Sequence, residues 1–513
     1  MSETLTRPTP RRRVALFAAL LAASLVALAP ARARQQGAPP RQGAARQSPA
    51  SPLKPCKVPG VNEELLCGKL PVFENRRARA GRKIALNVIV LHALEPVTGE
   101  APLFDLQGGH GVAATAQAPW YAGELKEYRR HRDVVLVDQR GTGASNPLQC
   151  GDEPDKYLGE MYPVEYVRNC RKKLEQVADL TQYTSPIAAD DLDDVRAWLG
   201  YDKINLTGLS YGTRAALVYL RQHPEHVRAA LLMGVAPTYA RLPMYHAPAA
   251  QRAMLLLFDE CAADKACASS YPRAREEFGE VLGRLARQPA RVKYALPVSK
   301  REAEITIERD VFAEKLRSQM YTPPGQRRLP YVIHRAAAGD FAPFLRMVVH
   351  EDDPAAPPTD PFIADGMYLS VTCAEDVPFI DLKEAERLSR PTYFGDYRLR
   401  QQRRACSLWA RGRVPGSFLA PVSSSAPVLI LDGRLDPVTP PAWGEQVAAH
   451  LPNSLYVLIR HHAHVPVGLT NIECLDRVTL DFLARASVAG LDTSCLDTMT
   501  PPPFYVEPPP KQQ

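Results

Sequence analysis

Short strand-like segments alternate with helical segments along much of this 513-residue chain, and the alternation predicts its fold class. The strand-like segments are apolar and rich in β-branched residues, while the segments between them have apolar residues at helical spacing. This order favours an α/β fold in which a mostly parallel sheet is covered by helices on both faces. The predicted strands are residues 83–94, 102–109, 133–141, 204–210, 228–237, 427–433 and 454–460, with helices at 185–201 and near 441–451.

The strand pattern is interrupted between residues 239 and 424. This stretch is helical, richly charged and broken by prolines, with few strand signals. We expect a helical lid inserted over the C-terminal edge of the sheet. The predicted sheet domain then has two parts, residues 53–238 and residues 425–500.

The two ends of the chain differ in composition from the region between them. Three arginines precede a 15-residue apolar run, and Ala-Arg-Ala at residues 31–33 follows it. This pattern predicts a secretory signal peptide over residues 1–33, and the run is short for a membrane anchor of about 20 residues. Residues 34–52 are expected to be a flexible linker and residues 501–513 a proline-rich tail. We therefore expect export to the periplasm or the medium, with no membrane segment after cleavage.

The basic charge of the chain is concentrated in the predicted signal peptide. The formal net charge is +7, from 63 basic and 56 acidic residues. Without the five arginines and one glutamate of residues 1–33, the counts are 58 and 55, a balance of +3. A balance this small gives no indication of a nucleic-acid partner.

Ten cysteines are consistent with export, because an even number in an exported chain suggests disulfides. Ten cysteines allow hundreds of complete pairings, so the sequence alone does not fix the connectivity. The absence of a close Cys-x-x-Cys pair argues against a metal site. The cysteines fall into five neighbouring couples, which we propose as the bridges: Cys56–Cys67, Cys150–Cys170, Cys261–Cys267, Cys373–Cys406 and Cys474–Cys495.

Ser210 stands between Gly208 and Gly212, after an apolar strand-like run and before helix-forming residues. Glycines on both sides allow a strand and a helix to approach closely while the serine takes a strained conformation. The arrangement predicts a nucleophile elbow, with the serine hydroxyl exposed above the N-terminus of the helix. The five-residue pattern also occurs by chance in surface loops. Other segments of the chain must therefore distinguish a catalytic serine from an ordinary loop residue.

The loops that follow the last two predicted strands contain an aspartate and a histidine at the edge where open parallel sheets bind ligands. Asp436 follows the next-to-last strand and His464 follows the last. Histidine can take the serine proton as a base, and a carboxylate can orient the imidazole. Asp432 is an alternative acid at the strand end, and His461 and His462 are alternative bases.

A glycine-rich turn at residues 107–113 follows another predicted strand. A backbone N–H at Gly109 or His110, together with the N–H of Tyr211, is expected to form an oxyanion hole. This chemistry needs no cofactor and no metal.

With these segments in view, the chain resembles the α/β-hydrolase peptidases of the prolyl iminopeptidase and tripeptidyl aminopeptidase group. The resemblance extends from about Cys56 to Cys495, and an Asp-x-Arg-Gly-x-Gly-x-Ser sequence begins at Asp138. The segments that carry it are residues 138–150, 208–227 and 435–441.

The resemblance implies that Ser210, Asp436 and His464 form the catalytic triad of an exported exopeptidase. Such enzymes remove residues from free peptide N-termini, often with a preference for proline or small residues. The resemblance also implies that Asp138 and Arg140 brace a loop near the active site, and that the neighbouring cysteines form local bridges.

Two departures from the pattern of the group leave the substrate open. His110 replaces the proline of the usual Gly-Gly-Pro-Gly turn, and Ala463 rather than glycine precedes His464. The substrate class is therefore a peptide or a small amide or ester. A secreted esterase with the same triad, or a non-catalytic binding protein on a hydrolase scaffold, remains an alternative. The sequence does not indicate an oligomeric state.

Glu375 and Asp376 are adjacent carboxylates in the predicted lid. An enzyme that cleaves at free N-termini must bind an ammonium group, and an acidic partner would offset the cost of desolvating it. We expect these two residues to bind the substrate amine. The alternative is a helix cap or a structural ion pair.

Overall fold

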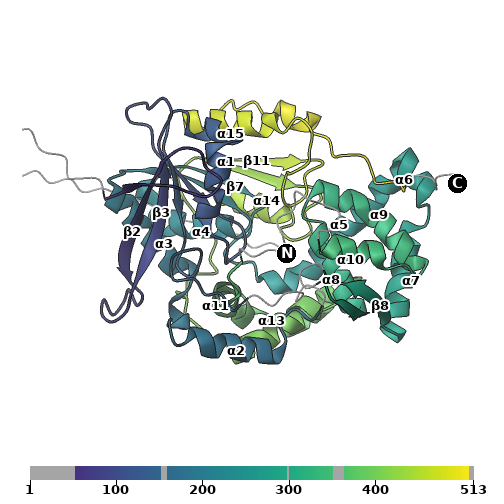
Figure 1. The fold of residues 1–513 in the computed structure, drawn as a ribbon. Helices are drawn as coiled ribbons and strands as arrows, with labels where there is room; N and C mark the ends of the chain where they lie inside the picture. The colour runs from purple at the N-terminus through teal and green to yellow at the C-terminus, as the bar shows by residue number, and fades with distance from the viewer. Residues whose placement is uncertain (1–51, 152–158, 297–299, 350–362, 508–513) are drawn as a thin grey trace, which may run out of the picture. The chain divides into compact units, whose positions relative to one another are not determined.

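A computed structural model of the protein describes residues 52–151, 159–296, 300–349 and 363–507. Its central element is a nine-stranded sheet (Figure 1). The predicted signal peptide and nearly all of the predicted linker lie outside the described residues, as does the end of the predicted tail. None of the helices in the described ranges combines the length and the apolar composition that a membrane-spanning helix needs.

The sheet is mostly parallel, as predicted. Its order is β1-β2-β3-β5-β4-β6-β7-β10-β11. The three pairs from β1 to β5 are antiparallel, and the five pairs from β5 to β11 are parallel. The strands are β1 (Lys54–Cys56), β2 (Leu65–Phe73), β3 (Lys83–Leu91), β4 (Leu103–Leu106), β5 (Val134–Val137), β6 (Ile204–Leu209), β7 (Val227–Met233), β10 (Val428–Gly433) and β11 (Ser454–Ile459).

Each of the seven predicted strands overlaps a strand of the sheet, whereas β1 and β2 were not predicted. β2 lies near the antiparallel edge and is partly exposed along most of its length. It also contains Gly68 and Pro71, so it lacks the continuous apolar run that marks a buried strand.

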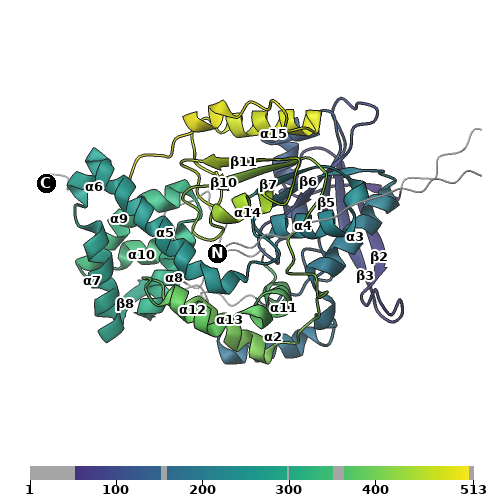
Figure 2. The same ribbon diagram turned by 180° about the vertical axis from the view of Figure 1, so that it is seen from behind.

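Helices cover both faces of the sheet (Figures 1 and 2). Helices α3 (Ser185–Leu199), α4 (Tyr211–Gln222) and α14 (Ala442–Ala448) pack against one face. Helices α1 (Ala118–Ala122) and α15 (Glu473–Arg485) pack against the other. Neighbouring residues of a strand point to opposite faces, so the strands supply both apolar cores.

Between β7 and β10 the chain forms mainly helices, many of which pack around a separate apolar core. A two-stranded antiparallel hairpin of β8 (Ala290–Ala295) and β9 (Glu302–Ile307) lies among them, and the sequence did not predict these two strands. One face of this hairpin is exposed and polar, which hides the strands from a search for apolar runs. The helices are α5 (Leu242–Ala263), α6 (Lys265–Ser270), α7 (Ala274–Arg287), α8 (Arg309–Gln319), α9 (Pro323–Ala337), α10 (Ala342–Val348), α11 (Asp365–Glu375), α12 (Leu382–Ser389) and α13 (Tyr397–Leu408).

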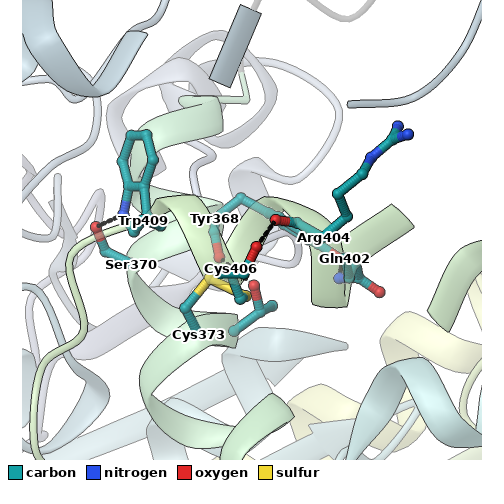
Figure 3. Close-up of a disulfide and its surroundings, with 9 residues drawn as sticks. Tyr368, Ser370, Cys373, Gln402, Arg404, Cys406 and Trp409 are labelled. Carbon is teal, nitrogen blue, oxygen red and sulfur yellow. Dashed lines mark hydrogen bonds between the residues drawn. A yellow bond between two sulfur atoms is a disulfide. The ribbon is translucent and has the colours of Figure 1, made fainter. Parts of the chain in front are cut away.

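Five disulfides join the ten cysteines in the same neighbouring pairs that their spacing suggests. The Cys373–Cys406 bridge ties α11 to α13 (Figure 3). Two hydrogen bonds reinforce this tie: Trp409 Nε1 donates to Ser370 Oγ, and Gln402 Nε2 donates to the Tyr368 hydroxyl. The bridged residues are 6 to 33 positions apart, for which chain entropy suggests about 2–4 kcal/mol of stabilisation each.

Candidate active site

Ser210 occupies the sharp turn between β6 and α4, as the sequence predicts. Its φ of 56° and ψ of −119° lie in a region that non-glycine residues rarely adopt. Such a conformation costs about 1–3 kcal/mol and persists only where neighbouring contacts enforce it. The Ser210 N–H donates to the Met233 carbonyl at 2.9 Å, which fixes the turn against the end of β7.

The two glycines beside Ser210 are required by the close approach of backbone to backbone. A Cβ at Gly212 would lie 1.8 Å from the Leu106 carbonyl oxygen, and a Cβ at Gly208 would lie 2.6 Å from the Gly212 oxygen. A side chain at either position would require the backbone to shift. Glycine is therefore required on both sides of Ser210 by the close packing of the strand-to-helix turn.

Asp436 and His464 are brought together from the loops after β10 and β11. Asp436 Oδ2 lies 2.7 Å from His464 Nδ1, and both side chains are buried. Asp436 Oδ1 accepts from the backbone N–H groups of Val438 and Thr439 at 2.8 Å each, and Oδ2 accepts from the Thr439 hydroxyl. Burial favours the neutral acid, yet the His464 ring and the bonds from Thr439 lower the pKa of Asp436 below its ordinary value. Asp436 is thus held as a carboxylate that can orient the imidazole.

The backbone of His464 is fixed by Tyr321, which lies between α8 and α9. The Tyr321 carbonyl accepts from the N–H groups of His464 at 3.0 Å and Val465 at 2.8 Å. The Tyr321 ring also meets the imidazole edge-on, with 4.9 Å between ring centres. Sequence reasoning missed Tyr321, because no local motif links it to a residue so distant in the chain.

The alternative acid and bases occupy other positions. Asp432 is fully buried and accepts from the Val235 N–H at 3.0 Å, so it holds the loop after β7. His462 is fully buried, its Nδ1 lies 2.6 Å from the Ala463 carbonyl, and burial lowers the pKa of its ring to about 4. His464 lines the large cavity beside Ser210, whereas His461 and His462 are absent from its described lining.

Ser210 and His464 line one cavity of about 690 Å³. The predicted oxyanion residues Tyr211, Gly109 and His110 line it as well. A Cβ on Gly108 would lie 3.1 Å from Ser210 Cβ, so the glycine-rich turn passes directly beside the serine. The cavity therefore brings together the serine, the histidine and all three predicted oxyanion residues.

Asp138 and Arg140 are fully buried in networks that brace the loop after β5. Asp138 accepts from the backbone N–H groups of Thr115 and Ala144, both at 3.0 Å. Arg140 forms a two-pronged ion pair with Asp191 of α3, at 2.6 and 2.8 Å. This geometry fits the structural role that the resemblance implies.

Glu375 and Asp376 have other partners than the expected substrate amine. Both are fully buried, and neither belongs to the described lining of the cavity. Asp376 pairs with Arg214 of α4, with Oδ1 at 3.0 Å, while Glu375 accepts from the N–H and hydroxyl of Ser185 at 2.6 and 2.8 Å. Burial raises the pKa of Glu375 to about 7. The geometry therefore favours the alternative of a structural ion pair over a role in binding the substrate amine.

The inserted helices supply cavity residues that sequence reasoning did not single out. Arg317 of α8 and Arg398 of α13 line the cavity, as do His246 of α5 and Tyr368 of α11. The disulfide Cys373–Cys406 joins α11, which carries Tyr368, to α13 (Figure 3). Arg398 is also a residue of α13. The side chains of Tyr368 and Arg398 meet only in the folded chain, so no spacing in the sequence indicates them.

Two segments of the chain match models of known families. Residues 109–297 match a model described as alpha/beta hydrolase fold, and residues 390–495 match one described as TAP-like protein. Together with the mostly parallel sheet and the turn at Ser210, the first match shows an α/β-hydrolase fold, as predicted.

Curated relatives resemble parts of the chain. The tripeptidyl aminopeptidase of Streptomyces coelicolor is 33% identical over 141 residues, covering 24% of this chain and 25% of the relative. The serine protease Hip1 of Mycobacterium tuberculosis is 30% identical over 247 residues, 44% and 46% of the two chains. The proline iminopeptidase of Aeromonas sobria is 31% identical over 139 residues, 26% and 28%. The chain thus spans less than half of each relative, and their names confirm the group that the sequence resembles.

Proposed function

We propose that the protein is an exported serine peptidase that removes residues or short peptides from free peptide N-termini. The observation that carries this proposal is the cavity shared by Ser210 and His464, with Asp436 hydrogen bonded behind the imidazole. The names of the relatives support a peptide substrate. A preference for proline at the cleaved position belongs to the same proposal.

In the proposed reaction, Ser210 Oγ attacks the scissile carbonyl carbon and His464 Nε2 takes the hydroxyl proton. The Nδ1–H of His464 donates to Asp436 Oδ2, which fixes the tautomer and stabilises the imidazolium. His464 then returns the proton to the leaving amine. A water molecule, activated by the same imidazole, releases the acyl group from Ser210.

The negative charge on the carbonyl oxygen needs donors that are already in place. The backbone N–H of Tyr211 lies at the N-terminus of α4, where the helix dipole favours negative charge. A second N–H would come from the turn at Gly109 and His110, which passes beside the serine. Removing one such donor typically costs about 10²–10³ in kcat.

Hydrolysis of an ester with the same triad is a second candidate function. No carboxylate is present in the described lining of the cavity, so no described side chain there would neutralise a substrate amine. An esterase has no need of such a group. Cleavage of short acyl esters without cleavage of amino-terminal amides would favour this candidate.

A panel of chromogenic amides, with free and with blocked N-termini, tests the proposal on the wild type and on Ser210→Ala. We expect hydrolysis of the free-amine amides by the wild type alone. Equal rates on blocked and free substrates would refute the exopeptidase proposal but would still be consistent with a serine hydrolase. Near-normal turnover in Ser210→Ala would refute the mechanism itself.

Export is supported by the five disulfides and by the signal-like N-terminal sequence. N-terminal sequencing of protein recovered outside the cytoplasm should begin at Arg34. A mature chain that still contains the apolar run would point to a membrane anchor instead.

A further inference from the structure

Two arginines of the inserted helices, Arg317 and Arg398, share one carboxylate. Glu314 accepts from Arg317 Nε at 3.0 Å and Nη2 at 2.7 Å, and from Arg398 Nη1 at 2.8 Å. Burial would raise the pKa of Glu314, but the two guanidinium groups together lower it to about 2. Glu314 is therefore ionised, and the cluster of two arginines and one glutamate has a surplus of one positive charge.

Both guanidinium groups line the cavity and keep hydrogen-bonding capacity. The remaining contacts of Arg317 and Arg398 are with uncharged groups, the hydroxyls of Tyr321 and Tyr368 and the amide of Gln402. Each guanidinium has five N–H donors and uses three of them in these bonds. Among the described residues, no second carboxylate balances the pair.

Two buried histidines in the same cavity have ring nitrogens without partners. Both ring nitrogens of His110 and Nδ1 of His246 make no hydrogen bond, although the side chains are only 6% and 4% exposed. Burial and the nearby arginines lower the pKa of both rings well below the ordinary value, so they are neutral. An unpaired polar group in such a position is costly unless an ordered water or a ligand satisfies it, and a ligand that enters the cavity can take the place of such a water.

We propose that this part of the cavity is a subsite for a carboxylate carried by the substrate, such as the side chain of an acidic residue near the scissile bond. A carboxylate has the charge that balances the surplus and the paired oxygens that match a guanidinium fork. His110 and His246 each offer a neutral donor to the same group. The inference rests on Ser210 as the nucleophile of the proposed function.

The turnover test compares two activated esters, a 4-nitrophenyl monoester of glutaric acid and its uncharged carboxamide analogue. We expect the wild type to prefer the carboxylate at least about tenfold in kcat/KM. Arg398→Gln should reduce that ratio about 10–100-fold. It leaves Arg317 and Glu314 as a balanced ion pair, so we expect the variant to fold, which its circular dichroism spectrum would check. Glu314→Gln raises the surplus charge and should keep or strengthen the preference.

The matched control is Arg400→Gln, an exposed arginine on the same helix that pairs with Asp396 and Asp310. It should retain the wild-type ratio. Equal losses on both esters in Arg398→Gln, or a wild type that prefers the carboxamide, would overturn the subsite.

A binding test separates this inference from the proposed catalysis. Glutarate should stabilise Ser210→Ala against thermal unfolding more than glutaramide does, and adding Arg398→Gln should remove the difference. This result supports the subsite even if no peptide is cleaved, whereas equal shifts from both compounds would refute it even if the peptidase activity is real.

Discussion

Replacing Gly212 by alanine tests how tightly the turn at Ser210 is packed. A Cβ at this position would lie 1.8 Å from the carbonyl oxygen and 2.7 Å from the carbonyl carbon of Leu106. Both are backbone atoms of β4 and cannot rotate away. Helix α4 and strand β4 would have to separate by about 1 Å at a point where the interior is close-packed.

The expected magnitude follows from two opposing effects. Overpacking of an interior site destabilises the fold by about 1–3 kcal/mol. The higher helix propensity of alanine stabilises the helix by up to about 1 kcal/mol relative to glycine. We therefore expect a net loss of about 1–2 kcal/mol in the free energy of unfolding. The same shift would move the Tyr211 N–H and Ser210, and a displacement of about 1 Å can cost about 10²-fold in rate.

Urea unfolding and the kcat of a simple activated ester measure the two effects separately. Gly283→Ala in α7 is the matched control, because its added Cβ would meet only the flexible end of Arg287, at 3.8 Å. That variant should be unchanged or slightly more stable. Wild-type stability and turnover in Gly212→Ala would refute the packing argument.

Three further predictions concern the triad, the bridges and the buried cluster. Ser210→Ala and His464→Ala should abolish most ester turnover with an unchanged fold, and Asp436→Asn should lower kcat by about 10⁴, because it disturbs the imidazole tautomer. Non-reducing peptide mapping should recover the Cys373 peptide linked to its α13 partner, and free thiols there would contradict the bridge. The pKa of Glu314 is lowered from 4.5 to about 2, so the carboxylate stabilises the fold above pH 4.5 and this contribution is lost as pH falls toward 2. In Glu314→Gln, the free energy of unfolding, measured by urea denaturation, should depend less on pH between 4.5 and 2 than in the wild type. The same pH dependence in both proteins would refute the lowered pKa of Glu314.

The parts of the site that lie at strand ends could be predicted from the sequence. Ser210, Asp436 and His464 each follow an apolar strand-like run, and the carboxyl ends of parallel strands meet at one edge of the sheet. The sequence named Asp436 as the acid of the triad and left Asp432 as an alternative, because the residues alone do not show which carboxylate reaches the imidazole. In the structure, Asp436 contacts the His464 imidazole, whereas Asp432 accepts a hydrogen bond from the backbone N–H of Val235.

The charged residues of the insertion could not be assigned from the sequence. The adjacent acids Glu375 and Asp376 suggested a binding site. In the structure Asp376 forms an ion pair with Arg214, which lies 162 positions away in the chain and could not be identified as its partner from the sequence. Arg317 and Arg398 belong to the richly charged stretch of residues 239–424, and nothing in their spacing distinguishes them from its other charged residues. Their role as cavity residues emerges only when α8 and α13 pack together around Glu314.

Tyr321 links the inserted helices to the loop after β11, because it contacts both the proposed catalytic base and the proposed carboxylate subsite. Its carbonyl fixes the backbone of His464, while its hydroxyl accepts from Arg317 at 3.2 Å. The proposed base and the positive cluster are therefore held by opposite ends of one residue. A shift of the α8–α9 connection that altered the charged wall would also move the imidazole relative to Ser210. In this cavity the groups that would recognise a substrate and the group that would accept the serine proton share one support, so substrate contacts with the insertion can influence the geometry of the reaction.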